Sequence, residues 1–255
     1  MKEFPSQVRK HLEILAKKAG RAVNKYGMFM AGERILLGIS GGKDSLVLAF
    51  ALASRLAWLP VSYHLEAVFI NWREFSIPEN AYQAICNYFK KLAVPLTRLD
   101  ESIFPESFKG HFNCYLCSRN KRRILFSEAA RRGIQTIALG HHLDDFIETT
   151  LLNLFFHGRF ESIKPVQSFF NGQIRVIRPL CEIKEKEINR ASRLLQAPVF
   201  DNPCPRKDLN RRQILKEFIH RLEKINRHVK DNIFYAPSRL AQTFHDELVR
   251  DQQER

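Results

Sequence analysis

The stretch Arg34–Ser45, RILLGISGGKDS, decides the fold that this sequence predicts. Its first half, RILLGIS, is a short apolar run of the length of one buried strand. Its second half, SGGKDS, is a glycine-rich polar loop, and an apolar helical pattern resumes directly after it at Leu46–Leu56. A strand, a glycine-rich loop and a helix in this order are typical of the ligand-binding turn of an α/β sheet.

The SGGKDS loop has the chemistry of an anion-binding site. Glycines let the backbone approach phosphate oxygens, successive N–H groups form a nest, and the dipole of the following helix favours negative charge. The loop is not a Walker A motif, because Leu37 stands where that motif has its first glycine. It also lacks the G-x-G-x-x-G dinucleotide pattern, and the competing interpretation is an ordinary glycine-rich turn. We expect it to bind nucleotide phosphates through Ser40, Gly41, Gly42, Lys43, Asp44 and Ser45.

Apolar runs alternate with helical patterns along most of the chain. Further strands are expected at Leu65–Asn71, Val94–Leu99, Ile134–Leu139 and Gln173–Pro179, and further helices at Pro5–Tyr26, Pro78–Leu92, Asn113–Arg132, His142–His157 and Ile183–Leu195. This alternation predicts an α/β fold, a Rossmann-like parallel sheet flanked by helices, with helical N- and C-terminal additions. The expected parts are an N-terminal basic helix (1–30), an α/β domain that contains the SGGKDS loop (31–205) and a basic helical C-terminal segment (206–255).

Composition excludes several classes of protein. Of the 255 residues 45% are hydrophobic and 27% charged, which is the balance of a globular chain and not of a disordered or collagen-like one. No apolar run approaches the roughly 18 to 20 residues of a bilayer span. The first residues, MKEFPSQVRKHLEILAKKAGR, lack the apolar core of a secretory signal. We therefore expect a cytoplasmic protein with no membrane partner.

The net charge points to a polyanionic partner. Lys and Arg number 41 against 27 Asp and Glu, a formal net charge of +14, which makes RNA or DNA a serious candidate. A basic but merely globular protein is the alternative. The densest basic stretch runs from Arg206 to Lys230, with nine Lys or Arg residues against three acidic ones. The residues expected to contact RNA are Arg119, Arg122, Arg123, Arg206, Lys207, Arg211 and Arg212.

The chain has only five cysteines, which are few for its length, and an odd number cannot all pair within the chain. A disulfide framework is therefore not expected. Cys114 and Cys117 form a C-x-x-C pair at the start of a basic helix, a spacing that can hold one metal ion or cluster. Lys121 follows Cys117 by about one helical turn, which places both on one helix face. Asp144 and Asp145 follow a predicted strand, where α/β sheets place their ligands.

Four stretches together resemble one family of enzymes. SGGKDS resembles the pyrophosphate loop of the N-type ATP pyrophosphatase superfamily, whose members cleave ATP between the α and β phosphates. CYLCSRNKRR (114–123), LGHHLDD (139–145) and NPCP (202–205) narrow the resemblance to tRNA 2-thiolation enzymes, of the 2-thiocytidine synthetase type and its 2-thiouridine relatives. The resemblance covers roughly Arg34 to Arg239 and implies an adenine nucleotide α-hydrolase-like fold.

This resemblance implies an ATP-dependent tRNA sulfurtransferase, which adenylates the C2 oxygen of a pyrimidine and replaces it with sulfur. The implied cofactors are ATP, Mg²⁺ and a [4Fe–4S] cluster, and the implied partners are tRNA and a sulfur donor, either a cysteine desulfurase or sulfide. Relatives of this type often form homodimers, so a second copy of the chain is also considered. The family motifs assign the cluster to Cys114, Cys117 and Cys204, further ATP contacts to Gly140 and His141, and catalytic roles to Lys121 and Asp145, with Asp145 also the candidate magnesium ligand.

Several alternatives stay open at this stage. The thiols could hold a structural zinc completed by Cys181 or His111, Lys121 could belong to an RNA-facing basic run, and Asp144 could take the role given to Asp145. Asn71 stands where relatives often carry Asp. The target base is undecided, with 2-thiocytidine favoured over 2-thiouridine. Competing functions are a lysidine-type modification, sulfuration of a small metabolite, and a non-catalytic RNA-binding protein.

Overall fold

The computed structural model describes residues 4–56, 62–103, 114–200 and 211–240, and of Cys114 only the backbone. The chain forms two compact units. Unit 1 comprises Met1–His142 and Pro165–Asp208, and unit 2 comprises Leu143–Lys164 and Leu209–Arg255. Among the described helices, none is both long enough and apolar enough to cross a membrane.

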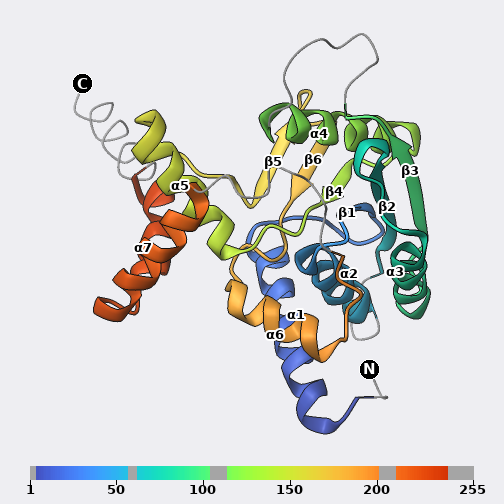
Figure 1. The fold of residues 1–255 in the computed structure, drawn as a ribbon, viewed down its shortest axis with the longest axis horizontal. Coiled ribbons are helices and arrows are strands. Elements are labelled where there is room, and N and C mark those ends of the chain that lie inside the picture. The colour runs from blue at the N-terminus through green and yellow to red at the C-terminus, as the bar shows by residue number, and fades with distance from the viewer. Residues whose placement is uncertain (1–3, 57–61, 104–113, 201–210, 241–255) are drawn as a thin grey trace. The chain divides into compact units, whose positions relative to one another are not determined.

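Unit 1 is built on a six-stranded sheet with the order β3-β2-β1-β4-β6-β5 (Figure 1). Its strands are β1 (Arg34–Ile39), β2 (His64–Trp72), β3 (Leu96–Glu101), β4 (Thr136–Ala138), β5 (Val166–Phe169) and β6 (Ile174–Ile177). All neighbouring pairs are parallel except β5 and β6. The expected α/β class with a mainly parallel sheet is confirmed.

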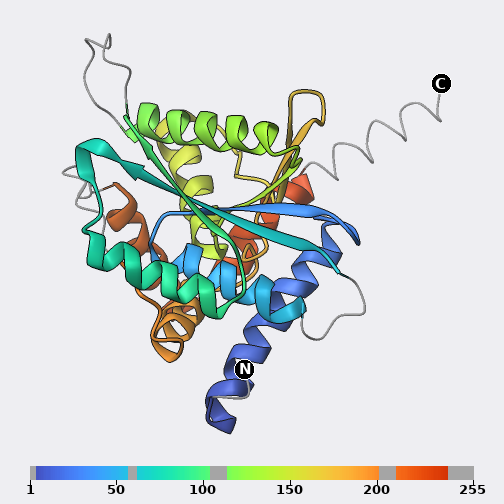
Figure 2. The same ribbon diagram turned by 90° about the vertical axis from the view of Figure 1, so that its right-hand side faces the viewer.

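Helices cover both faces of this sheet. The helices of unit 1 are α1 (Ser6–Lys25), α2 (Lys43–Leu56), α3 (Glu79–Lys91), α4 (Cys114–Arg131) and α6 (Glu185–Leu194), with a 3-10 turn η1 at Arg73–Phe75. Figure 2 shows α4 on one face of the sheet and α2 and α3 on the other. Helix α1 packs against α2 and α6, so the basic N-terminal helix belongs to unit 1.

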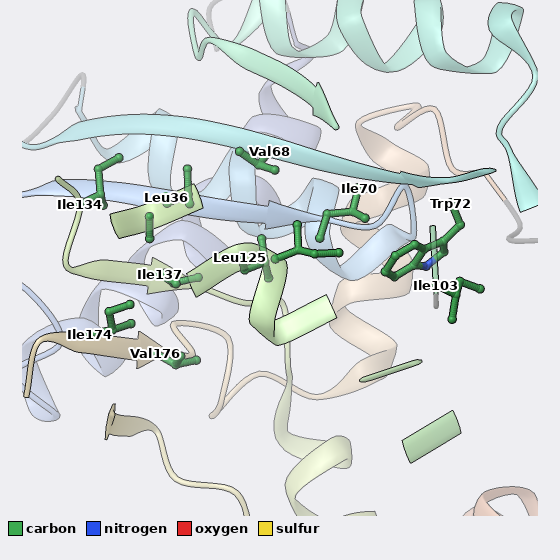
Figure 3. Packing of buried hydrophobic residues seen from close by; sticks show 12 residues of the cluster. Leu36, Val68, Ile70, Trp72, Ile103, Leu125, Ile134, Ile137, Ile174 and Val176 are labelled. Atoms are coloured by element: carbon green, nitrogen blue, oxygen red, sulfur yellow. The ribbon is translucent and has the colours of Figure 1, made fainter. Parts of the chain in front are cut away.

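The core beneath α4 fixes the position of that helix. In a strand alternate residues face opposite sides, so Leu36 of β1 and Val68, Ile70 and Trp72 of β2 point toward α4. They meet Leu125 of the helix, and Figure 3 shows this packing from close by. All five side chains are at most 5% exposed. Burying side chains of this size is worth roughly 1.5 to 3 kcal/mol each, which anchors α4 firmly to the sheet.

One strand lies outside the sequence prediction. The chain enters the last parallel strand through an antiparallel hairpin, β5–β6, whose turn places Phe170, Asn171 and Gly172 at φ values of 52, 53 and 91°. An Asn-Gly pair between two short strands is a strong hairpin signal, because both residues tolerate positive φ. The strand expected at Gln173–Pro179 is the shorter β6.

The topology has a switch point at the carboxyl edge of the sheet. From β1 the chain proceeds outward to β2 and β3 on one side, whereas β4 lies on the other side of β1. The direction of winding therefore reverses between β1 and β4, and such switch points are where open α/β sheets bind ligands. Ser40 follows β1 and Gly140 follows β4, so both flank this point.

Unit 2 is a helical unit made mainly of α5 (Leu143–His157) and α7 (Arg211–Ile225). Residues 229–240 are also helical, after a break at 226–228. Leu143, Ile147 and Leu151 of α5 pack against Leu215 and Ile219 of α7, and all five are buried. This packing holds α5 and α7 side by side (Figure 1).

Candidate active site

The SGGKDS loop is closed by its own serines. The Ser45 hydroxyl donates to the Gly42 carbonyl at 2.9 Å, and it accepts from the Ser40 N–H at 3.2 Å. The Gly42 N–H donates to the Ser40 Oγ at 3.3 Å. Gly41 has a φ of +79°, a conformation that residues with a Cβ rarely adopt. The loop is thus a preformed turn at the N-terminus of α2, which is the positive end of the helix dipole.

Gly140 brings the segment after β4 into contact with this turn. A Cβ at position 140 would lie 2.8 Å from the backbone carbon of Asp44 and 2.9 Å from the Ser45 nitrogen. Only glycine permits this approach, so the two segments that flank the switch point touch through their backbones. His142 lies next in line, with its Nε2 3.6 Å from the Asp44 Oδ1. His141 is partly buried beside it.

Lys43 is the cation of the loop. Its ammonium lies 3.2 Å from the Asp44 Oδ1 and 3.2 Å from the Oε1 of Glu185, which comes from the first turn of α6. Burial alone would lower the pKa of Lys43, but the two carboxylates together raise it above its ordinary value. Lys43 therefore stays protonated, and a phosphate group of a ligand could replace either carboxylate as its partner.

Four features occur together at this loop: a glycine with positive φ, a backbone contact that leaves no room for a Cβ, a helix N-terminus and a protonated lysine. Together these features fit a polyphosphate ligand. The loop is joined by Phe200, whose N–H donates to the Gly41 carbonyl at 3.0 Å. Cys204 lies four residues further along the chain, outside the described residues, as do Arg206 and Lys207.

Helix α4 starts with the C-x-x-C pair. Cys114 is its first residue, and Cys117 is a half-buried cysteine that packs against the core beneath the helix. Asn120 fixes this end of α4 at the carboxyl end of β3, because its amide donates to the Ile103 carbonyl at 2.6 Å. Cys117 is thereby held at the same edge of the sheet as the loop.

Lys121 lies on the same side of α4 as Cys117. Burial lowers the pKa of Lys121, and the neighbouring Cys117 sulfur opposes this shift. The side chain is partly buried, unlike the basic residues Arg119, Arg122 and Arg123 of the same helix, which are exposed. The last three project into solvent as RNA contacts would need to.

The carboxylates after β4 lie on α5, in unit 2. Asp145 Oδ1 lies 3.9 Å from the Arg212 guanidinium, which also lies 3.8 Å from the buried Glu148. Asp144 is a separate case, because Lys230 approaches it to 2.7 Å. The Lys230 ion pair occupies Asp144, whereas Asp145 sits nearer the surface of the unit. Arg211, another expected RNA contact, is exposed.

Asn71 has a structural role in this arrangement. Its amide donates to the Asp100 carboxylate at 2.5 Å, and its carbonyl oxygen accepts from the Ile77 N–H at 2.9 Å. Together with Arg98 this hydrogen bond lowers the pKa of Asp100. Asp100 is paired in register with Asn71, so the ionised carboxylate at this edge comes from β3 and not from β2.

Sequence reasoning did not find Glu185, Phe200 or Asn120, which complete the geometry. Glu185 is 142 residues from its partner Lys43 and is an ordinary acidic residue in a helical first turn. Phe200 acts through its backbone, which leaves no trace in the choice of side chain. Of these three residues, only Asn120 could have been noticed in the sequence, because it is an uncharged polar residue among the basic residues of the CYLCSRNKRR motif.

Comparisons with known proteins show what this chain is similar to. The model of the PP-loop domain family matches residues 11–223. The tRNA-cytidine(32) 2-sulfurtransferase of Geobacter sulfurreducens is 38% identical over 241 residues, covering 92% of this chain and 91% of that protein. The enzyme of the same name from Ralstonia pickettii is 34% identical, covering 90% of this chain and 75% of that protein.

Among solved structures, the U34-tRNA thiolase NcsA from Methanococcus maripaludis, with its [4Fe-4S] cluster, has a similar fold. Its TM-score is 0.73 at 22% identity, with 91% of this chain and 80% of that chain covered. At this level of identity the likeness concerns the fold alone.

Proposed function

Because the chain belongs to the PP-loop domain family, we propose that it is an ATP-dependent tRNA sulfurtransferase that converts a cytidine to 2-thiocytidine. The observation that carries the proposal is the backbone contact between Gly140 and the SGGKDS turn, with Lys43 beside it. The sulfurtransferase relatives, named for cytidine 32, favour cytidine over uridine as the target.

The reaction needs two displacements. In the first, the C2 oxygen of the cytidine attacks the α phosphorus of ATP, the bond to the β phosphate breaks, and pyrophosphate leaves. In the second, a sulfur nucleophile attacks C2, the C2–O bond breaks, and AMP departs with the original oxygen. An unactivated carbonyl is a poor electrophile, whereas AMP is a good leaving group.

The SGGKDS loop serves the first displacement. N–H groups at the start of α2 and the Lys43 ammonium would bind the β and γ phosphates, and thereby stabilise the charge that develops on pyrophosphate. Lys43 would exchange a carboxylate partner for phosphate when ATP binds. Gly140 and His141 would also contact the bound ATP, and Asp145 would hold Mg²⁺ on the phosphates or accept a proton.

Cys117 and Lys121 serve the second displacement. We assign cluster ligation to Cys114, Cys117 and Cys204; a [4Fe–4S] cluster held by three thiolates supplies one iron that is open to sulfur. The half-buried Cys117 beside a cation fits a thiolate ligand. The Phe200 N–H is hydrogen-bonded to the Gly41 carbonyl, so the chain lies beside the loop four residues before Cys204. Lys121 would stabilise the departing AMP.

tRNA is the proposed substrate, and residues 31–205 would carry out the catalysis. The N-terminal helix (1–30) and the C-terminal segment (206–255) would contribute phosphate contacts, together with the exposed arginines of α4. The sulfur donor would be sulfide or a cysteine desulfurase, and the enzyme would work in the cytoplasm, where tRNA is modified. A homodimer remains part of the proposal.

The test is to follow both products of ATP in the reconstituted protein. Pyrophosphate release should require unmodified tRNA, and AMP release should additionally require sulfide. Lys43→Ala should reduce pyrophosphate release by at least tenfold, since it removes a charge-assisted contact. Lys186→Ala, which removes an exposed lysine of α6, is the matched control and should leave the rate unchanged. Formation of ADP, or pyrophosphate release that ignores tRNA, would contradict the proposal.

A further inference from the structure

Unit 2 exposes a group of large apolar side chains. Phe155 and Phe156 at the end of α5 are 55% and 45% exposed, and Ile214 and Phe218 of α7 are 57% and 42% exposed. Arg211 of α7 joins them. These five residues form what we call the aromatic face of unit 2. An exposed cluster of this kind usually marks an interaction surface.

The rings of this face are held in fixed positions. The Phe155 and Phe218 rings pack edge to face with their centroids 6.2 Å apart. The Arg211 guanidinium lies over the Phe156 ring, 4.8 Å from its centroid. Each ring is therefore braced by one neighbour while much of its surface stays open to solvent. A preformed platform loses little side-chain entropy on binding.

Helix α7 separates its cations into two sets. Its inward side carries Leu215 and Ile219, and the flanking Arg212 and Lys216 approach the carboxylate of Glu148. The outward side repeats at helical spacing through Arg211, Ile214, Phe218 and Arg221. Both arginines on this side are exposed, so positive charge lies along the aromatic face at each end.

We propose that the aromatic face of unit 2 binds unstacked bases of a tRNA loop, an inference that rests on the proposed function. Aromatic rings and guanidinium planes are the surfaces on which splayed-out RNA bases stack, and adjacent arginines bind the connecting phosphates. Charge complementarity favours RNA over a second copy of the chain, because pairing this face with itself would bring two rows of arginines together.

The test measures RNA affinity separately from catalysis. The probes are an RNA hairpin with an unpaired loop of seven nucleotides and a fully paired duplex of similar length, with binding followed by fluorescence anisotropy at several salt concentrations. The double variant Phe156→Ala/Phe218→Ala should bind the hairpin at least about tenfold more weakly than the native protein, and the duplex equally well. Its dependence on salt should not change. The matched control is Phe170→Ala, a 60% exposed phenylalanine of unit 1, which should have no effect.

Arg221→Gln should give a different signature. It should weaken binding to both probes and reduce the slope of log affinity against log salt by about 0.7 to 0.9, the effect of one lost phosphate contact. Unchanged hairpin affinity in the double variant would overturn the proposal, and so would an equal loss on hairpin and duplex. A variant that dissociates a dimer while RNA affinity is kept would assign the face to self-association. The binding assay measures no turnover. A protein that fails to thiolate tRNA could therefore still show the expected RNA binding, and the two proposals can fail separately.

Discussion

The Lys43 ammonium and the Glu185 carboxylate lie 3.2 Å apart, although 142 residues separate them in the chain. Lys43 begins α2 directly after the glycine-rich turn, and Glu185 begins α6. The proposed phosphate-binding cation is thus paired with a carboxylate from a distant part of the chain. Under the proposed function, ATP would displace that carboxylate or share the lysine with it.

Glu185→Gln should therefore strengthen ATP binding. The variant removes a competitor for Lys43 and a negative charge near the phosphates, and a partly exposed ion pair of this kind is worth up to about 1 kcal/mol, so affinity should rise roughly twofold to fivefold. A titration with ATP in the absence of tRNA measures the effect. Glu187→Gln, which changes a nearby acidic residue that pairs with Lys18, is the control and should not alter affinity. Weaker binding by Glu185→Gln would show that Glu185 supports the site instead of competing for it.

Gly140→Ala should damage both stability and nucleotide binding. The new Cβ would meet the backbone of Asp44 at 2.8 Å, and overpacking of this kind costs about 1 to 3 kcal/mol. Denaturant unfolding and ATP titration together measure the change. Gly133→Ala separates the two effects, because position 133 has open space but a φ of +65°. It should lower stability without changing ATP affinity. Equal ATP affinity in Gly140→Ala and the native protein would remove Gly140 from the site.

Lys121→Met should stabilise the cluster-free protein near neutral pH and impair thiolation. The folded-state pKa of Lys121 is lower than the unfolded value of 10.5, chiefly because of burial. The unfolded chain therefore binds this proton more readily, and protonated Lys121 opposes folding most strongly below its folded pKa. The stability difference between Lys121→Met and the native protein should shrink as pH rises toward 10.5. Thermal unfolding between pH 7 and pH 10 checks the trend.

A matched variant is available on the same helix. Arg122→Gln removes an exposed charge and should leave both stability and its pH dependence unchanged. If Lys121→Met were less stable than the native protein at pH 7, the ammonium would be well compensated, and the catalytic role proposed for this partly buried cation would lose its basis.

Iron loading should depend on three cysteines only. Ala variants of Cys114, Cys117 or Cys204 should retain little iron after anaerobic reconstitution, whereas Cys181→Ala should retain the native content. Burial raises the pKa of the Cys181 thiol to about 12, which disfavours the thiolate that a metal needs. Iron and acid-labile sulfide assays on the four variants decide the assignment. Equal iron in all of them would refute it, and zinc in place of iron would support a structural metal site.

The central strands β1 and β2 could be predicted from the sequence because they are largely buried on both faces and read as apolar runs, as in RILLGIS and LEAVFIN. The antiparallel strand β5 could not be recognised in the same way, since its residues VQSF are only partly buried at the edge of the sheet. Its Asn171-Gly172 turn was the available signal. The family resemblance drawn from four short motifs is confirmed by the family match over residues 11–223.

Only some residues of the candidate site could be predicted from the sequence. The glycines and Lys43 could be predicted because they lie together in one contiguous sequence motif. Partners that act through long-range packing, such as Glu185, could not, because nothing in their local sequence distinguishes them. The sequence also did not reveal the partners of Arg212. This residue was expected as an RNA contact, and the structure places it beside the carboxylates Asp145 and Glu148.

The most direct test of the proposed thiolation activity is nucleoside analysis of the reaction product. Reconstituted protein would be incubated with unmodified tRNA, ATP, Mg²⁺ and sulfide, and the digested tRNA examined by mass spectrometry, with Cys117→Ala as the inactive control. We expect 2-thiocytidine, formed only when ATP is present and absent with the variant. Reaction without ATP, a lysidine-type product, or no thiolated nucleoside in protein that holds its full complement of iron would contradict it.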